Sequence, residues 1–290
     1  MTGKGSFLEV CVTKDLAREL INAGVHFGHG ASKWNPKMAP YIFGKRGNIH
    51  IIDVRQTLKG LLVAKKLVAE VVASGQDVLF VGTKRQAQKA VEDAATKAQM
   101  HYVSQRWPGG LLTNFRTIRS RLLRLEELEA MAQDGSLEQQ SKKHASRLKR
   151  EMRKIKANLD GVRKMAKLPG LVVVVDGREE YIALREAKKL GIPTIGILDT
   201  DADPDTVDVV IPANDDSIRA VEILLNQLAE AVAEGKALAA TRPQAATAGP
   251  AVKRGRSRTI TARADEEPAD QAEKVAVEQV EELPPAAEGV

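Results

Sequence analysis

Residues 116–167 read RTIRSRLLRLEELEAMAQDGSLEQQSKKHASRLKREMRKIKANLDGVRKMAK. This stretch shows only helical patterns, whereas the chain before and after it alternates short apolar runs with helical patterns, so it divides the rest of the chain in two. An apolar series with spacings of 3, 4 and 3 starts just before this stretch and runs through its first half: Phe115, Ile118, Leu122 and Leu125. The second half has the same kind of series in Leu148, Met152, Ile155, Leu159, Val162 and Ala166. Each series is the a/d seam of a coiled coil. Because the turn residues Asp134-Gly135-Ser136 lie between them, we expect an antiparallel helical hairpin.

The charge of this region suggests a function for the hairpin. Residues 97–167 contain 17 lysines and arginines against 7 aspartates and glutamates, a net charge of +10. A solvated coiled-coil surface is one explanation. Ten net positive charges on one element repel one another unless an anion neutralises them, which favours nucleic acid as the partner.

Composition limits the class of protein. The 290 residues carry a net charge of +6, and residues 169–240 are acidic, with 6 basic against 14 acidic side chains. Cys11 is the only cysteine, which excludes an intrachain disulfide and a cysteine zinc cage. No apolar run reaches the length of about 18 residues that a membrane span needs, and the N-terminus has no signal pattern. We expect a cytoplasmic protein without a membrane partner.

Outside residues 111–167, short apolar runs alternate with helical patterns. The expected strands are Ile49–Val54, Asp77–Val81, Tyr102–Ser104, Leu171–Val175, Thr194–Leu198 and Val207–Ile211. The expected helices are Lys14–Ala23, Gln56–Ala73, Gln86–Ala98, Glu179–Leu190 and Ser217–Glu234. This alternation predicts an α/β fold, with a parallel sheet of four or five strands and helices on both faces.

The chain is expected to divide into three parts. Residues 1–110 and 168–236 form a discontinuous α/β domain, and residues 111–167 form the inserted basic hairpin. Residues 237–290 are rich in Ala, Pro, Thr, Gln and Glu, so they cannot bury a core and should be a disordered tail. The basic cluster at 253–258 could touch RNA or be solvated.

Two segments of the α/β domain have the residue types of an RNA contact. The loop over residues 25–41 combines Phe27 and Trp34 with Lys33 and Lys37, where rings could stack on bases and lysines could neutralise phosphates. The rings could instead be core anchors of the loop. Gly82-Thr83-Lys84-Arg85 lies at a strand-to-helix turn, where free backbone N–H groups attract phosphate; it could equally be a bare turn.

Acidic residues are concentrated where two strands should end. Asp199, Asp215 and Asp216 form the expected trio for a divalent cation, because crowded carboxylates repel and open α/β sheets bind ligands at this edge. The competing interpretation is that Asp215 or Asp216 caps a helix within a solvated acidic loop. His26-x-x-His29 has no accompanying glutamate or cysteine, which argues against a catalytic metal.

No pattern supports catalysis. The chain lacks the glycine fingerprints of nucleotide sites and any nucleophile with a placed base. A nucleotide-dependent enzyme on this fold and a free RNA-binding regulator remain the alternatives.

Several motifs together resemble the bacterial small-subunit ribosomal protein S-two family. They include Ala23-Gly24-Val25-His26-Phe27-Gly28-His29, Trp34-Asn35-Pro36-Lys37-Met38, Phe80-Val81-Gly82-Thr83-Lys84-Arg85, Arg106-Trp107-x-Gly109-Gly110-x-Leu112-Thr113-Asn114 and Ile211-Pro212-x-Asn214-Asp215-Asp216-Ser217. The resemblance covers roughly residues 7–236. It implies a flavodoxin-like domain with an inserted coiled-coil hairpin, in a structural protein of the small ribosomal subunit that is not an enzyme and needs no cofactor.

The resemblance also implies partners. These are small-subunit ribosomal RNA, neighbouring small-subunit proteins and, in many bacteria, the mRNA-binding protein S-one. We expect contacts mainly to phosphates, with little base readout. The predicted RNA-binding residues are Lys33, Trp34, Lys37, Lys45, Arg46, Lys84, Arg85, Arg106, Arg116, Arg119 and Arg121. The acidic edge is then the expected protein-docking face.

Overall fold

The structure is a computed structural model that describes residues 15–136 and 141–241. Within these ranges the last helix, α7 (Ile218–Thr241), continues past the predicted start of the tail at residue 237. The rest of the predicted tail, with its basic cluster at 253–258, lies outside the described residues, as do residues 137–140 next to the predicted turn.

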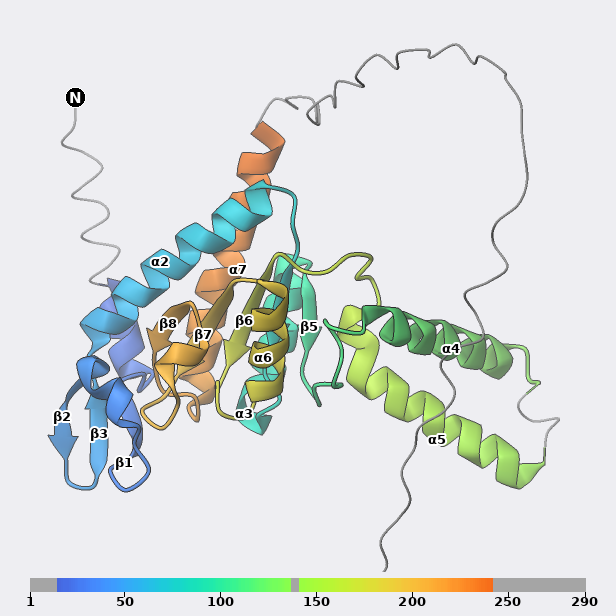
Figure 1. The fold of residues 1–290 in the computed structure, drawn as a ribbon, viewed down its shortest axis with the longest axis horizontal. Coiled ribbons are helices and arrows are strands. Elements are labelled where there is room, and N and C mark those ends of the chain that lie inside the picture. The colour runs from blue at the N-terminus through green and yellow to red at the C-terminus, as the bar shows by residue number, and fades with distance from the viewer. Residues whose placement is uncertain (1–14, 137–140, 242–290) are drawn as a thin grey trace, which may run out of the picture. The chain divides into compact units, whose positions relative to one another are not determined.

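A five-stranded parallel sheet forms the centre of the α/β part (Figure 1). Its strands are β4 (Val78–Val81), β5 (His101–Val103), β6 (Leu171–Val175), β7 (Thr194–Leu198) and β8 (Val209–Pro212). They lie in the order β5-β4-β6-β7-β8, and every neighbouring pair is parallel. Five of the six predicted strands therefore form the parallel sheet, at the upper end of the expected number, and the sixth is a strand of a separate sheet; the arrangement is consistent with a flavodoxin-like fold.

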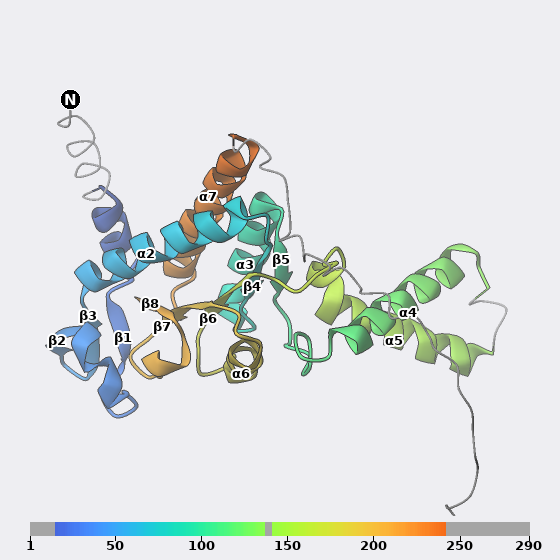
Figure 2. The same cartoon turned by 45° about the horizontal axis from the view of Figure 1, so that its top comes forward.

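Helices cover both faces of this sheet, as predicted. Helices α2 (Val54–Ala73), α3 (Arg85–Ala98) and α7 pack on one face, and α6 (Tyr181–Leu190) packs on the other. Figure 2 shows α2 and α7 on the opposite side of the sheet from α6. A further helix over residues 15–22 precedes the first strand.

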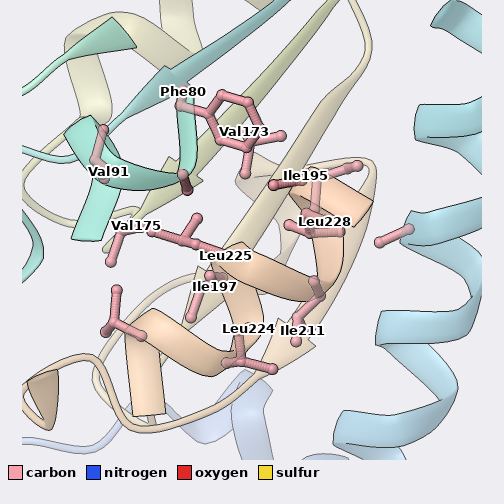
Figure 3. Packing of buried hydrophobic residues seen from close by; sticks show 14 of the residues in the cluster. Phe80, Val91, Val173, Val175, Ile195, Ile197, Ile211, Leu224, Leu225 and Leu228 are labelled. Atoms are coloured by element: carbon pink, nitrogen blue, oxygen red, sulfur yellow. The ribbon is translucent and has the colours of Figure 1, made fainter. Parts of the chain in front are cut away.

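The two faces alternate residue by residue along the strands. Phe80, Val173 and Val175 point into the core with α3 and α7 (Figure 3). Their neighbours Leu79 and Val174 belong to the second core, on the side of α6. Because both faces are buried, these strands are continuous apolar runs, and this is the pattern by which the sequence predicts them.

The segment before α2 differs from the prediction. Ile49–Ile52 is strand β3 of a separate antiparallel sheet and does not extend the parallel sheet. Its neighbours β1 (Phe27–Gly30) and β2 (Ile42–Arg46) fall within or beside the segment expected to be a loop. The sequence signal for this β-hairpin is Gly47-Asn48, the two-residue turn between β2 and β3. In this turn Gly47 adopts a left-handed φ of 61°.

Two long helices occupy the predicted hairpin region, α4 (Phe115–Gln133) and α5 (Lys142–Leu159). Leu128 and Leu148 are buried together, with Met131, Met152 and Ile155 packed against them. The second helix ends earlier than expected, because residues Asp160–Val162 form the 3-10 turn η2. Ile118, Leu122 and Leu159 join the core on the α6 side of the sheet, which ties the base of the helical pair to the α/β part.

Candidate nucleic-acid interface

The predicted arginines at the start of α4 are exposed and free of carboxylates. Arg116, Arg119 and Arg121 each face solvent, and no ion pair is formed by any of them among the described residues. Arg124 of α4 lies 2.8 Å from Glu127, and Arg163, just after η2, lies 2.6 Å from Glu129. Arg147, Lys149, Arg150 and Arg153 of α5 are exposed, as the α4 arginines are. The beginning of α4 is therefore uncompensated positive surface, together with exposed Arg106 in the loop before it.

The antiparallel sheet presents a second basic and aromatic surface. Lys33, Lys45 and Arg46 are exposed, and Trp34 is 37% exposed. The Trp34 ring lies against the His50 ring at a centroid distance of 5.1 Å. Trp34 is therefore a partly anchored ring with one part still open to solvent, so the prediction that it touches RNA stays a prediction.

Lys37 is exposed but already ion-paired. Its Nζ lies 3.0 Å from Asp203 and 2.6 Å from Asp205, and the hydrogen bonds to these two residues raise the pKa of Lys37. These pairs join the 3-10 turn η1 (Pro36–Tyr41) to η3 (Pro204–Thr206). A phosphate would have to compete with two carboxylates for this ammonium.

Lys84 is held still more firmly. Its side chain is 17% exposed, and its Nζ lies 2.8 Å from Asp215 and 2.6 Å from Asp216. Burial lowers the pKa of Lys84, but hydrogen bonds to Asp215 and Asp216 outweigh it and raise the pKa overall. Arg85, the next residue, is exposed. The geometry thus gives Lys84 a structural partner, and of the two turn residues only Arg85 is open to solvent.

His29 joins the acidic edge, which the sequence did not predict. His29 Nδ1 lies 2.7 Å from Asp199 Oδ2, and one ligand atom each from His29, Asp199 and Asp215 lie within 4.8 Å of one another. The hydrogen bond to Asp199 raises the pKa of His29 to about 9. Burial raises the pKa of Asp215 to about 7, against hydrogen bonding from Lys84.

The alternative interpretation, in which Asp215 or Asp216 caps a helix within a solvated acidic loop, agrees with the structure only in part: other side chains cap α7, and Asp216 is half exposed. Asp199 and Asp215 are each 1% exposed. The start of α7 is instead supported by Asn214 Oδ1, which accepts from the N–H groups of Asp216 and Ser217, and by the Ser217 hydroxyl, which accepts from Ala220. Asn and Ser side chains are efficient caps, so the aspartates are left to pair with Lys84 and His29.

The donor set can accept a divalent cation with nitrogen and oxygen ligands. One imidazole nitrogen and two carboxylates suit zinc or a similar ion. A cation would have to displace the proton of His29 and compete with the Lys84 ammonium, which already neutralises Asp215 and Asp216. Asp216, the third predicted ligand, is half exposed and bonds to Lys84, so His29 replaces it in the compact trio.

A buried glutamate fixes the loop that leads into α4. Glu186 of α6 accepts hydrogen bonds from Trp107 Nε1 at 3.1 Å and from the N–H groups of Gly110, Leu112 and Thr113 at 2.7, 3.1 and 3.2 Å. Burial raises the pKa of Glu186, but these donors outweigh burial and lower the pKa overall. No sequence signal links Glu186 to a loop more than 70 residues away.

The helices in the described ranges include none long and apolar enough to cross a membrane. The parallel sheet, the basic helical pair and the acidic edge together define an α/β protein whose positive and negative charges are concentrated on different elements.

Comparison with known proteins gives the family. The family model described as Ribosomal protein S2 matches residues 20–235. The chain is 55% identical to the small ribosomal subunit protein uS2 of Rhodopirellula baltica over 225 residues, which cover 78% of this chain and 86% of the relative. It is 51% identical to the protein of the same name from Solibacter usitatus over 223 residues, covering 77% of this chain and 74% of the relative.

The chain belongs to the ribosomal protein S2 family. It is therefore a structural protein of the small ribosomal subunit, associated with ribosomes in the cytoplasm, and not an enzyme. The resemblance seen in the sequence motifs is confirmed, and the nucleotide-dependent enzyme is excluded.

Proposed function

We propose that this protein binds small-subunit ribosomal RNA through basic residues of its loops and helical pair, and thereby supports subunit assembly and translation. The observation that carries the proposal is the exposed group Arg116, Arg119 and Arg121, which forms no ion pair among the described residues. Uncompensated arginines attract phosphates, and such contacts give affinity without base readout. Lys33, Trp34, Lys45, Arg46, Arg85 and Arg106 would extend this surface.

We further propose that α4 and α5 form an antiparallel coiled coil inserted between two segments of one α/β domain, residues 1–110 and 168–236. The burial of Leu128 against Leu148 and the ion pair between Arg124 and Glu151 at 3.8 Å support this arrangement. Interhelical charge pairs beside an apolar seam fix the register of coiled coils. Arg116, Arg119 and Arg121 would then lie at the base of the inserted unit, where Ile118 and Leu122 join the α/β core.

The acidic edge is proposed as the surface for protein partners. Neighbouring small-subunit proteins, and the mRNA-binding protein S-one where it is present, would meet carboxylates there, because negative surface is repelled by RNA. His29, Asp199 and Asp215 would hold a divalent cation if one binds. Calorimetric titration of the purified chain with zinc tests this, and a His29→Gln variant should bind more weakly; equal binding by both would remove His29 from the site.

Sedimentation tests the main proposal. The wild-type chain should sediment with small subunits at low salt and be released as salt rises, because phosphate contacts release counterions. Arg116→Ala/Arg119→Ala/Arg121→Ala should lower affinity for extracted small-subunit RNA by about tenfold or more and reduce the salt slope by about 2 to 3. A chain that remained in the soluble fractions, with salt-independent RNA binding, would point to a regulator outside the ribosome and overturn the proposal.

A further inference from the structure

Helix α6 turns its acidic and basic residues to opposite sides. Glu180 at its N-cap and Glu186 within it are 2% and 8% exposed, whereas Arg185, Lys188 and Lys189 are exposed. The buried carboxylates are consumed by internal donors, since Glu180 accepts from the N–H of Thr83 at 2.8 Å and Glu186 accepts from the loop before α4. The outer face of this helix is therefore basic, although residues 169–240 as a whole carry a negative net charge.

These three cations have no acidic partner. Among the residues that the structure describes, no carboxylate lies within ion-pair distance of Arg185, Lys188 or Lys189. Part of the positive charge can be explained locally, because Lys188 and Lys189 lie in the last turn and interact favourably with the helix dipole. Arg185 lies in the middle of the helix, where the dipole gives no such benefit.

The basic face continues the surface already proposed to bind RNA. Helix α6 and the base of α4 pack on the same side of the parallel sheet, through Leu184 and Ile118 in one core. Glu186, next in sequence to Arg185, bonds directly to Trp107 and Gly110, so the loop carrying Arg106 is fixed against this helix. The figures show α6 on that side of the sheet, opposite α2 and α7 (Figures 1 and 2).

We propose that the outer face of α6, formed by Arg185, Lys188 and Lys189, is a second phosphate-binding surface for ribosomal RNA. The inference rests on the proposed RNA-binding function and deepens it. Three uncompensated cations on a rigid helix fit a run of backbone phosphates, and their fixed relation to Arg106 lets one RNA segment contact both surfaces.

The test compares two matched triple variants of the full chain. Arg185→Ala/Lys188→Ala/Lys189→Ala removes the proposed contacts, and alanine keeps the helix because its helical propensity is the highest. Arg55→Ala/Lys59→Ala/Lys66→Ala removes the same number of charges from exposed positions of α2, on the other side of the sheet. A charge-preserving variant, Arg185→Lys/Lys188→Arg/Lys189→Arg, provides the rescue. Thermal unfolding confirms that each variant is folded.

Binding to extracted small-subunit ribosomal RNA is measured by filter retention from low to high salt. We expect the α6 triple to bind about tenfold more weakly, with a salt slope reduced by about 2 to 3, while the α2 triple and the charge-preserving variant bind as the wild type does. If the α6 triple binds normally while the α4 arginine triple loses affinity, the inference fails and the proposed function stands.

Three other outcomes also overturn the inference. If the α6 triple keeps its RNA affinity but no longer enters small subunits, the face belongs to a protein partner. If the wild-type chain itself shows no salt-dependent RNA binding, both the proposed function and the inference about α6 are overturned. An equal loss in the α6 and α2 triples would reduce the effect to net charge alone.

Discussion

At the scale of single residues, several carboxylates of this protein accept hydrogen bonds from distant segments inside the molecule. Glu186 is the clearest case, because one carboxylate satisfies the indole N–H of Trp107 and three backbone N–H groups of a tight loop. Buried N–H groups are costly when unpaired, so the carboxylate determines the conformation of that loop.

Glu186→Gln should destabilise the protein by about 2 to 3 kcal/mol, because the amide has one acceptor oxygen and its NH₂ group faces donors. Urea unfolding measures the loss, and Glu179→Gln, at an exposed position just before the same helix, is the control. Since the folded-state pKa of Glu186 lies below its ordinary value of 4.5, its contribution is fully present above pH 4.5 and is lost as pH falls through the folded pKa. The difference in unfolding free energy between the wild type and Glu186→Gln should therefore become smaller in acid. A difference that does not change with pH would contradict the proposed role of the Glu186 carboxylate.

His29 gives the opposite pH dependence. Its pKa is raised from 6.5 to about 9 by Asp199, so its contribution is complete below pH 6.5 and is lost as pH rises through about 9. Unfolding measured in chelator should show stability declining across this window in the wild type and a smaller decline in His29→Gln. An identical decline in both would assign it to other groups.

At the scale of secondary-structure elements, the contact between α4 and α5 is predicted to be locally weak far from the sheet. Among the described residues, a small apolar cluster around Leu128 and Leu148 holds that part, whereas Ile118 and Leu159 join the larger core. A segment with few buried apolar contacts opens more readily than the core.

Leu128→Ala should therefore increase hydrogen exchange in α4 and α5 while leaving the parallel sheet protected. The expected cost is about 2 to 4 kcal/mol, since the side chain is fully buried. Leu123→Ala is the matched control because Leu123, on the same helix, is 57% exposed. Loss of protection throughout the sheet would show that the helical pair is not a separate local unit.

Gly60 shows how a neighbouring element can reverse a local preference. In a helix interior, Gly→Ala normally stabilises by up to about 1 kcal/mol. A Cβ at position 60 would lie 2.3 Å from the backbone oxygen of Val210, so the backbones of α2 and β8 would have to move apart. Gly60→Ala should lower the melting temperature, whereas exposed Leu62→Ala should change it little; a raised melting temperature in Gly60→Ala would disprove the close approach.

At the scale of the whole molecule, positive surface and acidic edge suggest separate partners. Asp216 is the accessible member of the edge, with half of its side chain exposed, whereas Asp215 is buried; both carboxylates bond to the Lys84 ammonium. Asp216→Asn should reduce retention of partner proteins on isolated small subunits and leave affinity for extracted ribosomal RNA within about twofold, because surface carboxylates steer protein partners and not phosphates. Equal losses of both activities would contradict this division.

The amino-acid sequence was sufficient to predict the parallel strands, the helices on both faces and the two long helices α4 and α5. A strand that is buried on both faces must be a continuous apolar run, as in Leu171–Val175. A helix that is buried along one stripe must have regularly spaced apolar residues, as the leucines of α4 are. Both patterns are local, so they can be read from the sequence alone. The sequence motifs were also sufficient to place the chain in its family, because they occur in the same order along most of its length.

Which charged groups meet could be learned only from the three-dimensional fold. Lys84 with Asp215, His29 with Asp199 and Glu186 with the loop at Gly110 are pairs separated by 131, 170 and 76 positions. The Lys84 pair depends on the order β5-β4-β6-β7-β8, because parallel strands bring the ends of distant segments to one edge. The His29 pair depends on the separate antiparallel sheet that carries β1, and the Glu186 contacts depend on the placement of α6. For that reason the sequence could propose Lys84 as an open RNA contact, while the fold surrounds it with carboxylates and leaves the outer face of α6 basic.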